Sequence, residues 1–362
     1  MDKSISVIIP TYNEKDNITP LVEALHRALS GYRYEVIFVD DNSRDGTIDI
    51  AHSLEAKFPV KIIVRTTERG LATAVVEGFK HATGDIFVVM DADLQHPPEF
   101  IPSLLKGIED GADLAISSRY IPGGGTSNWS LSRRIISRGA IFMTHVLLPS
   151  THRIKDITTG FFALKREIVA GAELKPVGWK ILLEVVFMGK YQKAVEVPFV
   201  FTGREKGSSK LNIKPELEYL QHIWSLMRRK GETWRFIKFC IVGGTGVGVN
   251  LGVYWLLTRL AGLTGSYLNA LSLAIAFEAS VISNFTLNDF ITFTDRKAKS
   301  SGNFFIRLLK FNLFSLVGFG IQQGALLLFY NVLGWNDLIA VIIGIIIATL
   351  WNYIANSWWT WK

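Results

Sequence analysis

The first part of the chain alternates short apolar runs with segments whose apolar residues recur every three or four positions. The short runs predict buried strands at residues 4–10, 34–39, 60–64 and 86–90. The segments between them predict helices at residues 17–29, 47–57 and 70–82, the first capped by Asn17. Strands that alternate with helices pair in parallel and are covered on both faces. We therefore expect an α/β domain with a mainly parallel sheet covered by helices.

Two later segments have an apolar face and a polar face at helical spacing. In residues 131–148, Ile135 and Phe142 fall on the apolar side, whereas Arg133 falls on the basic side. The second segment, residues 213–230, is similarly divided and ends in three basic residues. Helices of this kind lie in the membrane interface. A surface helix that packs on its own domain is the alternative, and periodicity alone does not exclude it.

From residue 236 onward, long stretches almost free of charge replace this alternation. Each has about the 20 residues that a membrane-spanning helix needs. The expected spans are residues 236–258, 267–288, 307–333 and 338–359. Residues 235–239 recur in altered form at 307–311, which makes the spans two repeated hairpins. We expect an α/β domain over residues 1–212, an interfacial helix over 213–230 and an all-α membrane domain over 231–362.

Basic residues are distributed unevenly around the expected spans. They cluster before the first span and between the second and third, whereas the other two loops contain only Arg259. By the positive-inside rule, both termini and the α/β domain are expected in the cytoplasm of a multi-pass cell-membrane protein. The net charge of +7 suits a lipid bilayer and a phosphate-bearing substrate. No nucleic-acid partner is expected, because no basic and aromatic stripe of a known module is present.

Polar side chains follow the expected strands. Tyr12 and Glu14 follow the first strand, Asp41 follows the second, and Asp91 and Asp93 follow the fourth. The carboxyl ends of parallel strands converge on one crevice, where open α/β sheets bind ligands. The pattern predicts a nucleotide site, although the glycine-rich phosphate-binding signatures are missing.

Asp91, Asp93 and Gln95 offer a set of oxygen ligands suited to Mg²⁺ or Mn²⁺. Two prolines, at positions 97 and 98, stop the strand just beyond them. The alternative is an acidic turn that only solvates the strand end. Two aspartates separated by one residue occur about once by chance in a chain of this length, so the motif depends on its context.

Several segments together resemble a known family. The residues after the first two strands, 10–14 and 39–46, resemble the opening of the inverting, GT-A-fold nucleotide-sugar glycosyltransferases. Residues 91–97 narrow this resemblance to the polyprenyl-phosphate glycosyltransferases, and residues 133–140 and 203–211 are similar to those of the dolichol-phosphate mannose synthases. The membrane spans resemble the GtrA-like four-helix family, which is sometimes fused to such transferases.

The resemblance implies transfer of mannose from GDP-mannose to dolichol phosphate or another polyprenyl phosphate. The reaction would invert the sugar, require Mg²⁺ or Mn²⁺, and give dolichyl phosphate mannose and GDP. It implies catalytic roles for Asp91, Asp93 and Arg119 and a metal on Asp91, Asp93 and Gln95. The acceptor phosphate would contact Arg119, Arg133 and Ser137. The donor would contact Pro10, Tyr12, Glu14, Asp41, Asp91, Ala92, Asp93, Arg204 and Lys210.

Other interpretations remain open at this point. A polyprenyl-phosphate glucosyltransferase that uses UDP-glucose would need the same fold and metal site. A flippase or anchor for a lipid-linked sugar, with a soluble domain that only binds, is the alternative from another class. We expect Glu184 to be a paired structural carboxylate, Glu278 to have a role within the membrane, and the glycine-rich residues 122–126 to form a flexible lid or acceptor entry. The lipid length and the oligomeric state are not determined.

Overall fold

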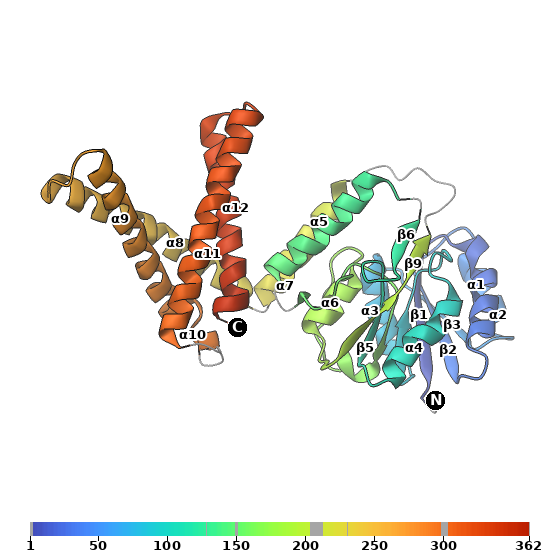
Figure 1. Cartoon of the computed structure of the whole chain (residues 1–362). Helices are drawn as coiled ribbons and strands as arrows, with labels where there is room; N and C mark the ends of the chain where they lie inside the picture. Colours follow the sequence, from blue (N-terminus) through green and yellow to red (C-terminus); the bar gives the residue numbers. More distant parts are fainter. Residues whose placement is uncertain are drawn as a thin grey trace. The chain divides into compact units, whose positions relative to one another are not determined.

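The computed structural model describes residues 3–127, 129–148, 151–202, 213–229, 231–297 and 303–361. The chain forms two units, the first ending at Leu226 and the second beginning at Met227. Each unit has a hydrophobic core of its own. Figure 1 shows an α/β architecture for the first unit and helices alone for the second.

A seven-stranded sheet in the order β3-β2-β1-β4-β7-β5-β8 forms the centre of the first unit (Figure 1). Its strands are β1 (Ile5–Thr11), β2 (Tyr34–Asp40), β3 (Val60–Val64), β4 (Ile86–Val89), β5 (Leu114–Ser118), β7 (Phe162–Lys165) and β8 (Ala194–Pro198). All pairings are parallel except those of β7 with β4 and β5. The predicted α/β fold with a mainly parallel sheet is confirmed. The strand β7 can run antiparallel to its neighbours because a long segment that includes β6 and α5, rather than a single crossover helix, connects it to β5.

Helices cover the sheet because their apolar stripes face it. They are α1 (Lys15–Ala28), α2 (Thr47–Leu54), α3 (Leu71–His81), α4 (Ile101–Glu109) and α6 (Ile181–Met188). The helix α1 buries Ile18, Leu21 and Leu25, as its periodicity predicted. Its start was predicted wrongly: the N-cap is Glu14, and the Asn17 side chain donates a 2.6 Å hydrogen bond to the Glu14 carboxylate from inside the first turn.

The glycine-rich segment 122–126, expected to be a flexible lid or acceptor entry, ends in a paired strand, and its role as a lid or entry stays a prediction. Its last residues belong to β6 (Gly125–Ser127), which pairs in parallel with β9 (Val200–Thr202). Gly124 lies so close to the Ser118 carbonyl oxygen that a Cβ atom would collide with it. Gly124 therefore allows a close backbone approach, and the strand pairing holds the end of the segment.

The helices α5 (Leu131–Leu147) and α7 (Ile213–Arg229) both belong largely to the first unit. They are joined by a hydrogen bond between the Thr144 and Tyr219 hydroxyl groups. The buried His222 of α7 also bonds to Glu184 of α6 at 2.7 Å. Glu184 additionally accepts from the Lys175 amide and is thus paired, as the sequence suggested.

Among its described residues the second unit contains four helices long and apolar enough to cross a membrane, as the sequence predicted; the exact bounds of the spans stay a prediction. These are α8 (Glu232–Trp255), α9 (Ser266–Leu287), α11 (Phe304–Leu326) and α12 (Asp337–Ala355), each extended by a π-helical turn; α10 (Thr294–Lys297) is short. The helices pack as two hairpins, α8 with α9 and α11 with α12 (Figure 1). The ring of Trp361 stacks on Phe293 at 4.3 Å and donates a hydrogen bond to Asp289, which also pairs with Arg307.

The intramembrane carboxylate Glu278 accepts a 2.6 Å hydrogen bond from the Asn312 side chain. This contact joins α9 to α11 and hence one hairpin to the other. It identifies the partner that the sequence left open. A function for Glu278 beyond this contact stays a prediction.

Candidate active site

One cavity of about 240 Å³ lies at the carboxyl ends of β1, β2 and β4. Its lining residues are Pro10, Thr11, Tyr12, Glu14, Asp41, Leu71, Asp91, Ala92 and Asp93. The fold thus brings together every residue predicted to hold the donor that the structure describes. Arg204 and Lys210, the predicted clamp on the donor, lie outside the described residues. We call this space the donor cavity.

The buried Asp40 carboxylate fixes the loops around the donor cavity. It accepts hydrogen bonds of 2.8 Å from the Thr11 hydroxyl and 2.7 Å from the Ser43 amide. Ser43 in turn accepts from the amide of Asn13, which has a left-handed backbone (φ 55°). The ends of β1 and β2 are therefore tied to one another, which holds Tyr12 and Glu14 at the cavity wall.

Asp41 is not a free ligand for a nucleoside. Its carboxylate accepts hydrogen bonds from the Arg65 guanidinium and from the Gly70 amide. The next arginine, Arg69, lies 5.2 Å above the Tyr12 ring. The sequence analysis did not identify Arg65 and Arg69 as residues near the donor cavity. The signal that could have identified them is that both follow the third strand within five residues.

The turn that carries Asp91 and Asp93 is held in an unusual backbone conformation. Leu94 has φ 59°, which is costly for a large side chain. The Asp93 carboxylate accepts a 3.1 Å bond from the Gln95 amide, which closes the turn. Strain kept at such a position is typical of functional sites.

The buried His96 side chain contacts the backbone at Asp91 and holds it in place. Its Nδ1 atom accepts a 3.0 Å hydrogen bond from the Asp91 amide, and its ring stacks on Phe161 at 5.0 Å. Burial lowers the pKa of His96, although the charge of Asp91 opposes this effect. The imidazole is therefore neutral near pH 7, with its proton on Nε2.

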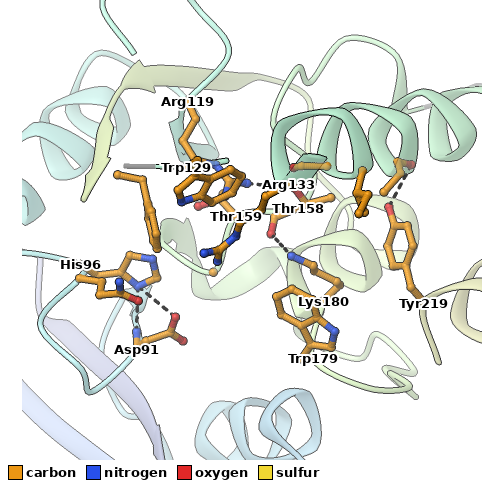
Figure 2. A pocket seen from close by; sticks show the side chains of 16 residues that line it. Asp91, His96, Arg119, Trp129, Arg133, Thr158, Thr159, Trp179, Lys180 and Tyr219 are labelled. Atoms are coloured by element: carbon orange, nitrogen blue, oxygen red, sulfur yellow. Dashed lines mark hydrogen bonds and ion pairs between the residues drawn. The ribbon is translucent and has the colours of Figure 1, made fainter. Parts of the chain in front are cut away.

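A second cavity of about 240 Å³ adjoins the same aspartate (Figure 2). The residues that line it include Asp91, Gln95, Arg119, Arg133, Ser137 and Lys180. All three residues predicted to hold an acceptor phosphate thus reach one space. We call it the acceptor cavity.

Arg119 is anchored more firmly than the sequence suggested. Its Nε and Nη2 atoms donate to both oxygens of the fully buried Asp156 at 2.7 Å. Burial by itself lowers the pKa of Arg119, but the hydrogen bonds to Asp156 and its charge raise it above the ordinary value. This pair leaves Nη1 as the part of the guanidinium best able to meet a ligand.

Arg133 lies over the Trp129 ring at 4.2 Å, and Ser137 accepts a 2.8 Å hydrogen bond from the Tyr120 hydroxyl. Burial, and secondarily the charge of Arg119, lower the pKa of Arg133. Two arginines that repel one another in a partly buried cavity favour an anion between them.

Sequence reasoning missed a lysine and two tryptophans in the acceptor cavity. Lys180 donates a 2.7 Å bond to the Thr158 carbonyl and lies 3.4 Å from the Trp179 ring centre. Figure 2 shows Trp179 and Lys180 on one side of the cavity and Trp129 with Arg133 on another. The neighbouring tryptophan and lysine in a polar loop were the only signal, because their distance from Asp91 depends on the fold.

The oxygen groups of Asp91, Asp93 and Gln95 suit Mg²⁺ or Mn²⁺. Within the described part of the chain, no group of three His, Cys, Asp or Glu side chains could hold a metal ion. Two carboxylates whose remaining coordination comes from phosphate and water are the usual arrangement for Mg²⁺. The residues therefore fit a metal that binds together with a diphosphate.

Family models match both units. Residues 6–171 match glycosyl transferase family 2, and residues 238–361 match the GtrA/DPMS transmembrane domain. A dolichol-phosphate mannosyltransferase of Pyrococcus furiosus is 47% identical over 99% of this chain and 99% of its own length. One from Saccharomyces cerevisiae is 40% identical over 62% of this chain and 88% of its own.

A polyprenol monophosphomannose synthase of Mycolicibacterium smegmatis is 38% identical over 57% of this chain and 80% of its own length. Among solved structures, glucosyl-3-phosphoglycerate synthase from Mycobacterium tuberculosis, in complex with Mn²⁺, uridine diphosphate and glucosyl-3-phosphoglycerate, has a TM-score of 0.50. It is 19% identical and covers 63% of this chain and 80% of that one. This likeness shows a shared GT-A-like fold.

Proposed function

The chain belongs to the dolichol-phosphate mannosyltransferases, glycosyltransferases that here carry a GtrA/DPMS membrane domain, and on this premise we propose its reaction. It transfers mannose from GDP-mannose to a polyprenyl phosphate, with inversion, and releases GDP. Relatives named for mannose transfer to dolichol phosphate or polyprenol support the sugar and the lipid.

The observation that carries this proposal is that Asp91 lines both cavities. The donor cavity has an aromatic ring and acidic groups, whereas the acceptor cavity has Arg119, Arg133 and Lys180. A donor diphosphate bound on one side of Asp91 would meet a lipid phosphate bound on the other. Transfer of a sugar between two phosphate compounds requires that both are held close together in this way.

The acceptor cavity supplies positioning and charge rather than a base. A lipid phosphate is an anion at neutral pH, so its oxygen attacks without losing a proton first. Arg133 and the Nη1 side of Arg119 would hold that phosphate by charge-assisted hydrogen bonds. The oxygen bonds to the anomeric carbon as the bond to the diphosphate breaks on the opposite face, which inverts the sugar.

Asp91 and Asp93, with the Gln95 side chain, would hold a divalent cation on the donor diphosphate. When bound, the cation offsets the charge that develops on the leaving GDP. His96 would support this function through the Asp91 backbone, since its Nδ1 atom accepts a hydrogen bond from the Asp91 amide.

Two exposed apolar faces would place the active site at a membrane surface. Leu131, Ile135 and Phe142 are more than half exposed on α5, as are Leu217 and Trp224 on α7. We propose that these faces enter the membrane interface, with the first unit and both termini in the cytoplasm. The basic residues that flank the spans support this orientation.

The donor is tested by direct competition. The purified enzyme receives Mn²⁺, a polyprenyl phosphate and equal concentrations of GDP-mannose and UDP-glucose, and the lipid product is identified by mass and sugar analysis. We expect mannosyl lipid to predominate by tenfold or more, because one or two unpaired buried polar groups cost roughly 1–3 kcal/mol each in the wrong complex. A mainly glucosyl lipid would overturn the proposal in favour of the glucosyltransferase.

A further inference from the structure

The segment that carries Asp156, residues 154–159, is buried except for Lys155, although it belongs to no helix or strand. It lies between α5 and β7 in the chain. Backbone N–H and C=O groups that are buried outside regular structure need partners from elsewhere, because an unpaired buried group is costly. The side chains that supply these partners therefore decide the path of the segment.

This segment determines where two cations of the acceptor cavity lie. The Asp156 carboxylate accepts hydrogen bonds from the Arg119 amide at 2.9 Å and from its Nε atom at 2.7 Å. The Thr158 hydroxyl accepts from Nη2 of Arg119 at 3.0 Å, and the Thr158 carbonyl accepts from Lys180 at 2.7 Å (Figure 2). A displacement of residues 154–158 would therefore move both Arg119 and Lys180.

One side chain of β8, that of Glu196, holds two consecutive amides of the segment. Its Oε2 atom accepts from the Lys155 amide and its Oε1 atom from the Asp156 amide, both at 2.9 Å. The strand β8 is the outer strand of the sheet and pairs in parallel with β5, whose end leads to Arg119. A carboxylate that uses both of its oxygens in this way fixes the orientation of two peptide groups.

The helix α5 holds one of these peptide groups as well. The Nε2 atom of His145 bonds to the Ile154 carbonyl at 2.9 Å, and that carbonyl belongs to the same peptide group as the Lys155 amide. A carbonyl oxygen only accepts, so Nε2 carries the proton. Burial lowers the pKa of His145, whereas the bond to Ile154 and the charge of Glu196 oppose this effect. One buried peptide group is thus held by α5 at its oxygen and by β8 at its nitrogen.

We infer that Glu196 and His145 are positioning residues for the acceptor phosphate. Neither lines the acceptor cavity. They act through residues 154–158, which orient the Arg119 guanidinium and place Lys180. The inference rests on the proposed function for the identity of the anion, a polyprenyl phosphate.

The test measures binding of a lipid phosphate separately from sugar transfer. The full-length protein in detergent is titrated with farnesyl phosphate in a calorimeter, which gives a Kd, and steady-state kinetics give the KM for GDP-mannose. We expect Glu196→Ala to raise the Kd for farnesyl phosphate about tenfold or more, because two charge-assisted bonds are lost, and to change the KM for GDP-mannose by less than about twofold. Glu196→Gln keeps one acceptor oxygen at the same length and should raise the Kd by a smaller factor, roughly threefold to fivefold.

His145 allows a conservative replacement that restores its contact. The amide nitrogen of a glutamine can take the place of Nε2 and donate to the Ile154 carbonyl, whereas a leucine offers no donor. We expect His145→Leu to raise the Kd for farnesyl phosphate roughly threefold to tenfold, the effect of one hydrogen bond, and His145→Gln to raise it less than about twofold.

Asp113 provides a matched control for the loss of a carboxylate that bonds two consecutive amides. It accepts from the amides of Gln192 and Lys193 at 2.9 and 3.0 Å, just before β8 begins. The five residues of β5 separate Asp113 from Arg119, a distance of roughly 16 Å. Asp113→Ala should lower the melting temperature at least as much as Glu196→Ala, yet change the Kd for farnesyl phosphate by less than about twofold.

An Arg119→Met background tests whether Glu196 acts through Arg119. The addition of Glu196→Ala to this variant should raise the Kd for farnesyl phosphate by about threefold or less, because the guanidinium that Glu196 helps to orient is already absent. An undiminished effect in this background would overturn the inference.

Three further outcomes would overturn it: an unchanged Kd in Glu196→Ala, an equal rise of the Kd and of the KM for GDP-mannose, or an equal rise of the Kd in Asp113→Ala. If Glu196→Ala does not fold, Glu196→Gln decides by the same criteria. A Kd in His145→Gln as high as in His145→Leu would remove His145 from the positioning residues.

The donor competition is run on the wild type from the same preparation. Mannosyl transfer together with an unchanged Kd in the variants defeats this inference alone. Glucosyl transfer, or no transfer, together with the expected changes in Kd defeats the proposed function alone, because binding of farnesyl phosphate does not depend on the donor.

Discussion

At the scale of single residues, the proposed mechanism depends most on Asp91, because its carboxylate borders both cavities. We expect Asp91→Asn to lower kcat on the order of 10²-fold to 10³-fold, since charge stabilisation of the leaving group is lost. Removal of divalent ions by a chelator should abolish transfer by the wild type. Steady-state kinetics with and without added Mn²⁺ would measure both effects.

The matched control is Asp110→Asn, an exposed aspartate at the end of α4. It removes one carboxylate of the same unit and should leave kcat within a factor of two, as surface substitutions usually do. A contrary result would be full activity of Asp91→Asn, equal to that of Asp110→Asn, together with full activity of the wild type in chelator. Asp91 and Asp93 would then belong to an acidic turn that only solvates the strand end.

Arg133 and Arg134 are neighbours on α5 with different surroundings. Arg133 lines the acceptor cavity and stacks on Trp129, whereas Arg134 donates to the Thr126 carbonyl at 3.4 Å. We expect Arg133→Ala to raise the KM for polyprenyl phosphate roughly tenfold to a hundredfold, the loss of a charge-assisted hydrogen bond, with little change in the KM for GDP-mannose. Arg134→Ala should raise neither KM by more than twofold. A donor-side defect in Arg133→Ala would contradict the assignment.

At the scale of secondary-structure elements, α5 has two different surfaces. Arg133 and Ser137 face the acceptor cavity, while Ile135 and Phe142 are exposed by 61% and 70%. A helix with this division can bring a membrane lipid to a soluble active site.

The change that tests this arrangement is Phe142→Glu. It should weaken transfer to a long-chain acceptor in vesicles at least fivefold, because a charge replaces an apolar group in the interface. Transfer to a short-chain acceptor in detergent should change by less than twofold. Initial rates with both acceptors give the comparison, and equal losses with the two would count against an interfacial position.

At the scale of the whole molecule, all described residues of both cavities of the proposed active site lie before residue 227. The segment that matches glycosyl transferase family 2, residues 6–171, also lies before it. We expect a protein that ends at residue 230 to transfer mannose to a short-chain acceptor in detergent with at least a tenth of the full-length rate. It keeps α7, whose Ile223 and Leu226 are buried in the first unit.

Circular dichroism and donor binding would show whether that shortened protein is folded. A folded protein that binds GDP-mannose without turnover would mean that the membrane unit completes the active site. The same protein should lose preference for long-chain acceptors, since it lacks the four spanning helices.

The sequence by itself determined the elements of this protein and the residue types of its site. Apolar spacing gave the first four strands, the helices between them, the two amphipathic helices and the four apolar helices of the second unit, because burial of one face, or of a whole helix in lipid, imposes a period on neighbouring residues. The aspartate pair at the end of β4 was visible for the same reason: a strand end and its turn are local features.

Only the tertiary structure decided which of these residues work together. Asp156 holds Arg119, Lys180 reaches the acceptor cavity, and Asn312 meets Glu278, each from a separate element. The antiparallel direction of β7 likewise came from the fold. Such contacts join residues far apart in the chain, so no local period records them. Packing of the complete sheet and helices alone sets these distances.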